Sequence, residues 1–422
     1  MESQLQHYDV VIIGGGPAGS ATGAWLARRG HRTLIIEKDH HPRFHIGESL
    51  LPLSLPYLED LGVIDEIEEI GLRKYAAEFH SPYHGRNIAF SFGDAVKPDY
   101  PFAYEVKRSE FDEILFRNAS KLGADVLEGV TVDQAQIHQG RIQSISALDS
   151  RGVRHQYQAK FFVDASGRET FLASALNIKQ KNPRHKSAAL YAHYEGATRN
   201  SGQAEGNIAI YWFDYGWFWM IPLKDGTMSV GAVCKPSYLK TRQGEVCEFF
   251  DETINLAPMV KERLRDATRV TEVTGTGNYS YRSTQIHGQN FLLVGDAYTF
   301  IDPVFSSGVH LALAGAEKAS HAISMILDQP EAAGQALQRY ESGVIRGVNQ
   351  FAWFIYRITH PAIRDLFMNP RNELKMKNAV VSLLAGDLFR NTPLTLPLIA
   401  FRCVFFIKSW LMRLGLAKSV TY

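Results

Sequence analysis

The chain has 422 residues, with 45 Lys and Arg against 44 Asp and Glu, a formal net charge of +1 and 45% hydrophobic residues. This length predicts two or three structural units, and the apolar content excludes a disordered chain. The near-neutral charge argues against a nucleic-acid partner, because such proteins carry a strong basic excess.

The cysteines, the histidines and the start of the chain narrow the class of protein further. Cys234, Cys247 and Cys403 form no disulfide framework, and the 15 histidines show no metal-ligand spacing, so we predict no metal. Residues 1–10 are polar and lack the apolar core of a signal peptide. The sequence also contains no uncharged apolar run of about 20 residues, so we predict no membrane span. We therefore expect a cytoplasmic enzyme.

A glycine-rich turn follows the first predicted strand. Residues 9–13 form an apolar run typical of a buried strand, a helix is predicted over 20–29, and a second strand over 33–36 ends in Glu37. The glycines have the G-x-G-x-x-G spacing, which allows a tight turn, close approach to a pyrophosphate and close helix–strand packing. Glu37 can accept hydrogen bonds from a ribose diol. The turn residues predicted to bind a dinucleotide are Gly14, Gly16, Pro17, Ala18 and Gly19.

Two later strands end at the same crevice in this prediction. An apolar run precedes residues 164–168, and residues 291–294 lead into Gly295 and Asp296, with a helix predicted over 309–326. Three strand ends at one crevice suit an elongated dinucleotide with a large ring, which favours FAD. No second complete glycine fingerprint is present, so we expect one nucleotide site.

The middle of the chain predicts a second, antiparallel sheet. Apolar segments at 207–213, 217–223 and 227–233 are separated by short polar turns, one of them Asp-Gly, which is a hairpin signal. Residues from about 340 onward are predicted to be mostly helical. The apolar stretch 394–407 contains a proline and an arginine, and we expect it to dock on the body rather than contact a membrane.

The predicted fold class is α/β, with a Rossmann-like FAD-binding domain interleaved with an antiparallel β-sheet substrate domain and followed by a helical C-terminal region. The predicted divisions are 1–80, 101–175 and 285–335 for the FAD-binding domain, 81–100 and 176–284 for the sheet domain, and 336–422 for the helical region.

Several segments resemble the flavin-dependent halogenases. Residues 217–222 read W-x-W-x-I-P, which resembles the signature of that family and is the most specific of these motifs. Residues 44–52, FHIGESLLP, resemble the segment after the family's second strand, and residues 300–308 resemble its F-x-x-P-x-x-S-x-G loop. Lys74 stands where the family carries its catalytic lysine. The resemblance runs from about residue 7 to about residue 390.

The resemblance implies a halogenase that uses reduced FAD, oxygen and chloride or bromide to halogenate an electron-rich aromatic. Trp217 and Trp219 would fill the space beside the flavin and keep the organic substrate away from it. The amides of Ser307 and Gly308, at a helix start, would hold the halide. Lys74 would either hydrogen-bond hypohalous acid as an ammonium or carry the halogen as a haloamine.

Related flavoproteins also suggest the remaining cofactor contacts and a partner. By this resemblance the FAD contacts beyond the glycine turn are Glu37, Lys38, Arg43, Ile46, Gly47, Glu48, Ser49, Arg108, Asp296, Pro303, Gly308 and Val309. The sequence has no fingerprint for NAD(P)H, so a separate flavin reductase is expected to supply reduced FAD.

One departure from the family bears on the substrate. Tryptophan halogenases carry a glutamate just before the serine of the 300–308 loop, where this chain has Phe305. Its absence disfavours free tryptophan and matches the branch that acts on phenols or pyrroles, often tethered to a carrier protein. An aromatic hydroxylase or a reductase of isoprenoid or polyene double bonds remains an alternative, because these chemistries share the scaffold.

Overall fold

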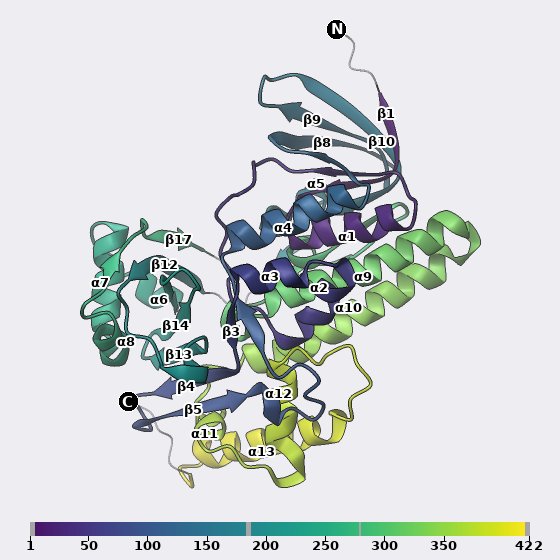
Figure 1. Cartoon of the computed structure of the whole chain (residues 1–422). Helices are drawn as coiled ribbons and strands as arrows, with labels where there is room; N and C mark the ends of the chain where they lie inside the picture. The colour runs from purple at the N-terminus through teal and green to yellow at the C-terminus, as the bar shows by residue number, and fades with distance from the viewer. Residues whose placement is uncertain (1–4, 183–186, 278–279, 418–422) are drawn as a thin grey trace.

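The structure is a computed structural model that describes residues 5–182, 187–277 and 280–417 (Figure 1). Within these ranges the first large sheet has seven strands in the order β7-β2-β1-β10-β9-β8, with β19 paired to β10. Its strands are β1 (Gln6–Ile13), β2 (Thr33–Ile36), β7 (Asp125–Leu127), β8 (Val130–His138), β9 (Arg141–Asp149), β10 (Arg154–Asp164) and β19 (Phe291–Leu293).

The parallel part of this sheet brings distant segments together. Strands β1, β2, β10 and β19 run parallel, so their carboxyl ends lie at one edge. Three helices pack beside them, α1 (Pro17–Arg28), α4 (Arg108–Lys121) and α9 (Ser307–Asp328), and α1 contacts both of the others. The glycine turn, residues 164–168 and the Gly295-Asp296 pair therefore meet, as predicted.

The second large sheet has eight strands and is mostly antiparallel. Its order is β16-β12-β15-β14-β13-β4-β5, with β17 paired to β12. Its strands are β4 (Ala76–Ser81), β5 (Arg86–Ser91), β12 (Ala188–Glu195), β13 (Ile208–Phe213), β14 (Gly216–Pro222), β15 (Met228–Cys234), β16 (Thr268–Arg269) and β17 (Thr274–Thr276). Two small sheets complete the strands, one of β11 (Lys179–Lys181), β18 (Tyr281–Ser283) and β20 (Thr299–Phe300), the other of β3 (Leu72–Lys74) and β6 (Ala103–Glu105).

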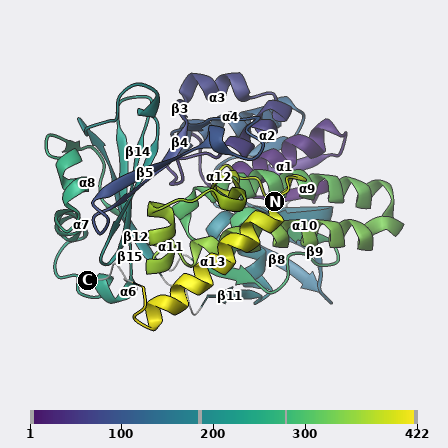
Figure 2. The ribbon, with the colours of Figure 1, turned by 90° about the horizontal axis from the view of Figure 1, so that it is seen from below.

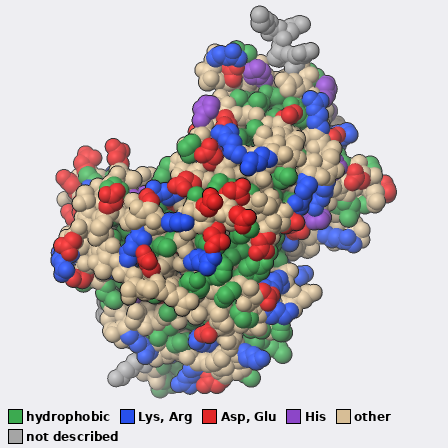
Figure 3. Space-filling model, in the orientation of Figure 1, with side chains coloured by type: hydrophobic (Ala, Val, Ile, Leu, Met, Phe, Trp, Pro, Cys, Tyr) green, Lys and Arg blue, Asp and Glu red, His purple; other side chains and the backbone are tan. Residues whose placement is uncertain are grey.

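The remaining helices surround the sheets. They are α2 (Leu55–Leu61), α3 (Ile64–Ile70), α5 (Phe171–Ala175), α6 (Pro236–Leu239), α7 (Val246–Asn255), α8 (Pro258–Arg263), α10 (Ala333–Ile355), α11 (Pro361–Met368), α12 (Met376–Leu384) and α13 (Thr395–Arg413). Figure 1 shows α6 to α8 against the second sheet on the left and α11 to α13 at the bottom. On the face drawn in Figure 3, basic and acidic side chains are interspersed.

The predicted fold class is confirmed, with two differences in detail. The division predicted at residue 80 falls inside β4, which already pairs with β5 and β13 from Ala76 onward. The C-terminal apolar helix α13 extends beyond the predicted stretch 394–407 to Arg413, and Pro397 lies in its first turn, where a proline removes no intrahelical hydrogen bond. Among the described residues it is the one helix that is long and apolar enough to cross a membrane. Only 22% of its apolar window is buried inside the protein.

Candidate active site

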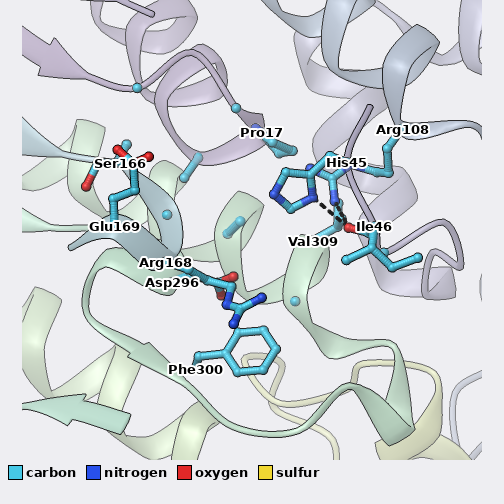
Figure 4. A pocket seen from close by; sticks show the side chains of 18 of the residues that line it. Pro17, His45, Ile46, Arg108, Ser166, Arg168, Glu169, Asp296, Phe300 and Val309 are labelled. Atoms are coloured by element: carbon cyan, nitrogen blue, oxygen red, sulfur yellow. Dashed lines mark hydrogen bonds between the residues drawn. The ribbon is translucent and has the colours of Figure 1, made fainter. Parts of the chain in front are cut away.

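A cavity of about 450 Å³ lies at the carboxyl edge of the first sheet, a size typical of small-molecule sites (Figure 4). The predicted site residues that line it are Gly14, Gly16, Pro17, Ala18, Glu37, Lys38, Arg43, Ile46, Gly47, Glu48, Ser49, Arg108, Trp217, Trp219, Asp296, Pro303, Ser307, Gly308 and Val309. Gly19 and Lys74 do not line it. The structure thus brings together segments that are almost 300 residues apart in the chain.

In the glycine turn, a Cβ would collide with neighbouring backbone at Gly14 and Gly19 but not at Gly16. Gly14 has φ of +103°, and a Cβ there would lie 2.4 Å from the carbonyl oxygen of Ala165. At Gly19 a Cβ would lie 1.9 Å from the carbonyl oxygen of Gly14, so this glycine lets α1 pack on the turn without itself reaching the cavity. At Gly16 the nearest atom would be the Arg43 guanidinium at 3.5 Å. The amides at the start of α1 therefore face open space, which suits a phosphate.

Glu37 supports the turn as well as the cavity wall. It follows β2 and is 4% exposed. Its carboxylate accepts hydrogen bonds from the backbone N–H of Gly15 at 2.6 Å and of Asp39 at 3.0 Å. One oxygen atom thus orders the glycine turn, and the carboxylate remains at the wall where a ribose would lie.

Two arginines of the wall share one buried carboxylate that the sequence analysis did not identify. Arg108 donates to Asp112 through Nε at 2.7 Å and Nη2 at 2.9 Å, and Arg43 donates through Nη1 at 2.9 Å. Burial alone would raise the pKa of Asp112, but the charge and hydrogen bonds of Arg108 and the charge of Arg43 outweigh it and lower that pKa. The i,i+4 spacing of Arg108 and Asp112 on a helix is the signal that could have predicted this pair.

Arg108 also shapes the loop after β2. Its Nη1 donates to the carbonyl oxygen of Ile46 at 2.8 Å, and His45 Nδ1 lies 2.7 Å from the same oxygen (Figure 4). The positive charge of Arg108 lowers the pKa of His45 to about 4. Next in the loop, Glu48 lies 2.8 Å from His193 Nε2 of the second sheet.

The far wall carries a carboxyl group and an arginine. Asp296 lies just after β19, where burial raises its pKa to about 6 against the opposing charges of Arg168 and Arg108. Arg168, from the segment after β10, donates to Thr276 Oγ1 at 2.5 Å, and its guanidinium lies 5.5 Å from the Phe300 ring. Figure 4 shows Asp296, Arg168 and Phe300 gathered on one side of the cavity. A carboxylate here is able to accept hydrogen bonds from sugar-alcohol hydroxyls.

The start of α9 faces the same cavity. Ser306 precedes the helix with φ of +55°, and Ser307 and Gly308 form its first residues. A Cβ at Gly308 would meet no atom within 4 Å. The first amides of a helix lack intrahelical acceptors and carry the positive end of its dipole, so this corner is suited to an anion.

The two tryptophans of β14 lie on one face of their strand, as their spacing predicts. Trp217 and Trp219 line the cavity with ring centroids 6.0 Å apart, whereas Phe218 and Met220 point into a separate core beside α7. Trp219 is held by a hydrogen bond from Nε1 to Ser229 Oγ at 3.2 Å. Opposite it, Gly231 leaves room for the ring, since a Cβ there would lie 2.1 Å from the indole.

Lys74 lies in a second cavity, much smaller and almost entirely apolar. This cavity, which we name the lysine pocket, measures about 10 Å³, about the space that one water molecule needs. Lys74 Nζ donates to Ser49 Oγ at 2.7 Å and to the carbonyl oxygen of Leu50 at 2.5 Å, and it lies 5.5 Å from the Phe92 ring. The other residues that line the lysine pocket are Leu51, Ala77, Phe79, Phe92, Ile208, Ile210, Val304, Phe305, Ser306 and Leu384.

Shared residues connect the lysine pocket with the large cavity. Ser306 lines both, and Ser49 lines the large cavity while accepting a hydrogen bond from Lys74. The two sites are therefore adjacent, with Lys74 separated from the large cavity by a single layer of residues.

A second buried acid stands beside Lys74. Glu105 Oε1 is 3.9 Å from Lys74 Nζ and accepts a hydrogen bond from Ser49 Oγ at 3.2 Å, while its other oxygen is buried without a hydrogen-bond partner. Burial raises the pKa of Glu105 to about 8, although the charge of Lys74 opposes this, and burial lowers the pKa of Lys74. The sequence analysis missed Glu105, although a lone glutamate inside the apolar run 101–106 was a usable signal.

The sequence analysis also missed one stretch of the large cavity. Val130, Thr131 and Val132 of β8 line it beside Lys38, whose ammonium pairs with Glu169. No glycine, charge or motif marks these three residues, because their place depends on how β8 joins the sheet.

Comparison with known proteins agrees with this geometry. A family model described as tryptophan halogenase matches residues 96–361, and one described as FAD dependent oxidoreductase matches residues 9–176. A tryptophan 2-halogenase of Chondromyces crocatus is 35% identical over 75% of this chain, which spans 61% of that relative's length. A pyrrole-2-carbonyl carrier-protein chlorinase of Pseudomonas fluorescens is 29% identical over 90% of each chain. The corresponding brominase of Pseudoalteromonas luteoviolacea is 34% identical over 77% of this chain and 79% of its own.

Solved structures extend the likeness to the fold. The myxobacterial chondrochloren halogenase, an FAD-dependent enzyme, superposes with a TM-score of 0.80 at 30% identity, covering 90% of this chain and 97% of its own. A flavoprotein/dehydrogenase of Cytophaga hutchinsonii superposes with a TM-score of 0.87 at 25% identity, covering 97% and 100%. The family match, the relatives and the paired cavities together place this chain in the family of FAD-dependent halogenases.

Proposed function

We propose that this enzyme halogenates a phenol or pyrrole with chloride or bromide, reduced FAD and O2, and that Lys74 handles the hypohalous acid. The observation that carries the proposal is the lysine pocket, where a buried ammonium faces an apolar, water-sized space beside the large cavity. Such a pocket can hold a small neutral oxidant and present it to one side only.

The large cavity fits FAD by the chemistry of its wall. Gly16 and the start of α1 would hold the pyrophosphate, Glu37 the ribose, and Asp296 the ribityl hydroxyls. Arg43 and Arg108 contribute positive charge, although both are already hydrogen-bonded to Asp112. When bound, reduced FAD supplies the electrons for the overall reaction FADH2 + O2 + X⁻ + H⁺ → FAD + HOX + H2O.

The chain's own residues would then separate the formation of hypohalous acid from the halogenation of the organic substrate. The amides of Ser307 and Gly308 would bind the halide at the start of α9. Trp217 and Trp219, both almost fully buried, would occupy the wall and exclude an organic ring from that part of the cavity. Hypohalous acid from the large cavity would reach Lys74 past Ser306, which lines both cavities.

Lys74 would act as a hydrogen-bond donor to hypohalous acid. An ammonium has three donors, and Ser49 and Leu50 accept two of them, so one remains for the oxygen of HOX. This hydrogen bond makes the halogen more electrophilic. The aromatic carbon bonds to X, the X–O bond breaks with its electrons on oxygen, and ArH + HOX becomes ArX + H2O.

The substrate class, the reductase and the location extend this proposal. Phe305 lines the lysine pocket where a tryptophan halogenase has a carboxylate, which disfavours free tryptophan, and two relatives are named for pyrrole groups on carrier proteins. We propose a small aromatic substrate, free or carrier-bound, a separate flavin reductase and a cytoplasmic setting.

The direct test is an assay with bromide. The protein is incubated with FAD, a flavin reductase with its reductant, bromide and an electron-rich phenol or pyrrole, free and carrier-bound, and the products are analysed by mass spectrometry. Bromine isotope doublets on a phenol or pyrrole would support the proposal. Bromination of free tryptophan in preference to both would contradict the substrate class.

A second candidate function is an FAD-dependent hydroxylase or double-bond reductase. It is favoured by the likeness to the Cytophaga flavoprotein/dehydrogenase over nearly the whole chain. In the same assay, a product that gains oxygen or hydrogen without bromine would favour this candidate.

Glu105→Gln is expected to shift the alkaline limb of the halogenation pH profile to lower pH. Glu105 is the acid nearest the Lys74 ammonium, and removing its charge lowers the pKa of Lys74 further. The protonated lysine is then lost at lower pH, by at least about one pH unit. The measurement is kcat against pH.

The matched control is Glu110→Gln, an exposed glutamate five residues later in the chain, in the first turn of α4. It should leave the pH profile unchanged. An unshifted alkaline limb in the Glu105 variant, with FAD binding intact, would rule out this role for Glu105.

A further inference from the structure

The outward face of α13 is a continuous apolar stripe, which is unusual for a helix on the outside of a protein. Trp410 is 60% exposed and Ile407 is 59% exposed. The exposed apolar side chains of the stripe are Leu396, Ile399, Phe406, Ile407, Trp410 and Leu414, which recur at helical spacing. Leu374 is also 74% exposed, in the 3-10 turn at residues 373–375 that contacts α13.

The opposite face of α13 is anchored on the protein. Leu398, Phe401 and Phe405 are buried, and α13 packs against α11 and α12. The Lys408 ammonium pairs with Asp365 of α11, and the guanidinium of Arg402 lies 5.0 Å from the ring of Trp353. Because these contacts would have to break before α13 could span a bilayer, the helix can lie on a surface without leaving the body.

The helix is placed to meet a flat surface. In Figure 2, which views the molecule from below, α13 lies lengthwise across the near side, in front of α11 and α12. Its long axis therefore runs along the outside of the molecule, and the exposed apolar side chains recur along most of its length.

The hydropathy and charge of α13 favour a lipid surface among the possible partners. By length and composition the helix could cross a membrane, and only 22% of its apolar window is buried. It carries no aspartate or glutamate, and its exposed cation is Arg413 in the last turn, since Lys408 pairs with Asp365 and Arg402 lies against Trp353. An anionic lipid surface would satisfy both the exposed apolar side chains and Arg413.

We propose that α13 is an interfacial anchor that lies in the headgroup region of an anionic phospholipid bilayer, with its apolar stripe among the acyl chains. Trp410 and Phe406 would sit at the depth where aromatic side chains are enriched in membranes. This anchor is independent of the halogenation chemistry proposed above, and it would bring the lysine pocket close to substrates dissolved in or bound at a membrane.

The test is flotation of the full chain with lipid vesicles. Binding to vesicles of mixed phosphatidylglycerol and phosphatidylcholine is expected, with weaker binding to phosphatidylcholine alone and a decrease as salt is added. The double variant Phe406→Gln, Trp410→Gln should lower binding by about tenfold or more. The double variant Leu256→Gln, Val270→Gln removes exposed apolar side chains elsewhere and should bind like the parent chain.

Three results would overturn the proposal. The first is that the parent chain fails to float with anionic vesicles at low salt. The second is a dimer in sedimentation that the Phe406/Trp410 variant dissolves, without vesicle binding. The third is loss of binding to an acidic carrier protein in the same variant, again without vesicle binding. Bound FAD fluorescence and the melting temperature, measured for every variant, separate these results from misfolding.

Discussion

Lys74→Ala is expected to lower the halogenation rate by about a thousandfold or more while leaving FAD affinity close to that of the parent chain. Lys74 lies outside the large cavity, so the cofactor loses no direct contact. What is lost is the donor that would hold hypohalous acid in the lysine pocket. The measurements are product formation with bromide and the dissociation constant of FAD from fluorescence.

Two further variants separate chemistry from folding. Lys74→Met keeps the aliphatic stem that packs near Phe92, so it should fold well and be as inactive as Lys74→Ala. Lys224→Ala changes an exposed lysine that donates to the backbone carbonyls of residues 68 and 69, and it should keep full activity. Substantial activity in the folded Lys74→Met variant would disprove the proposed role, and loss of FAD affinity in it would show that Lys74 is structural.

Arg108→Met is expected to destabilise the fold by about 3 kcal/mol and to weaken FAD binding. Asp112 would keep its buried charge but lose two of its three hydrogen bonds from arginines. The carbonyl of Ile46 would also lose its hydrogen bond from Arg108, which loosens the loop that lines the cavity. Thermal or urea unfolding gives the stability, and fluorescence titration gives the FAD affinity.

A control on the same helix and a double variant test this explanation. Arg117→Met removes an exposed arginine whose pairs with Glu113 and Glu128 should be worth less than about 1 kcal/mol. The double variant Arg108→Met, Asp112→Leu should regain stability without regaining FAD affinity, because it removes the uncompensated charge but not the loss of the Ile46 contact. Stability equal to the parent chain in the single Arg108 variant would contradict this account.

The local parts of the fold could be predicted because short-range patterns determine them. The G-x-G-x-x-G spacing requires glycines where a Cβ would collide with Ala165 or Gly14, and the strand that ends in Glu37 follows at its expected place. The alternation of β14 placed Trp217 and Trp219 on one side. Parallel strand pairing then brings distant strand ends to one edge, whatever the length of chain between them.

The sequence marks the two missed acids only by weak local signals, and their roles depend on contacts that are distant in the chain. Asp112 matters because Arg43 reaches it from 69 residues earlier in the chain. Glu105 stands out as a lone glutamate in an apolar run, but its place beside Lys74 depends on the pairing of the short strands β3 and β6, which the sequence does not predict. Their roles emerge only when the second sheet and the loop after β2 pack against the cofactor layer.

Leu384 has a consequence for how such enzymes diversify. It closes one side of the lysine pocket from α12, a helix that begins more than 60 residues after the last segment that lines the large cavity. Most of the lysine pocket comes from segments that also line the large cavity or adjoin it, whereas Leu384 comes from a helix that lines no part of that cavity. A substitution at Leu384 would therefore change the shape of the lysine pocket without altering the glycine turn, the two arginines or the start of α9, so the two cavities could vary separately in evolution.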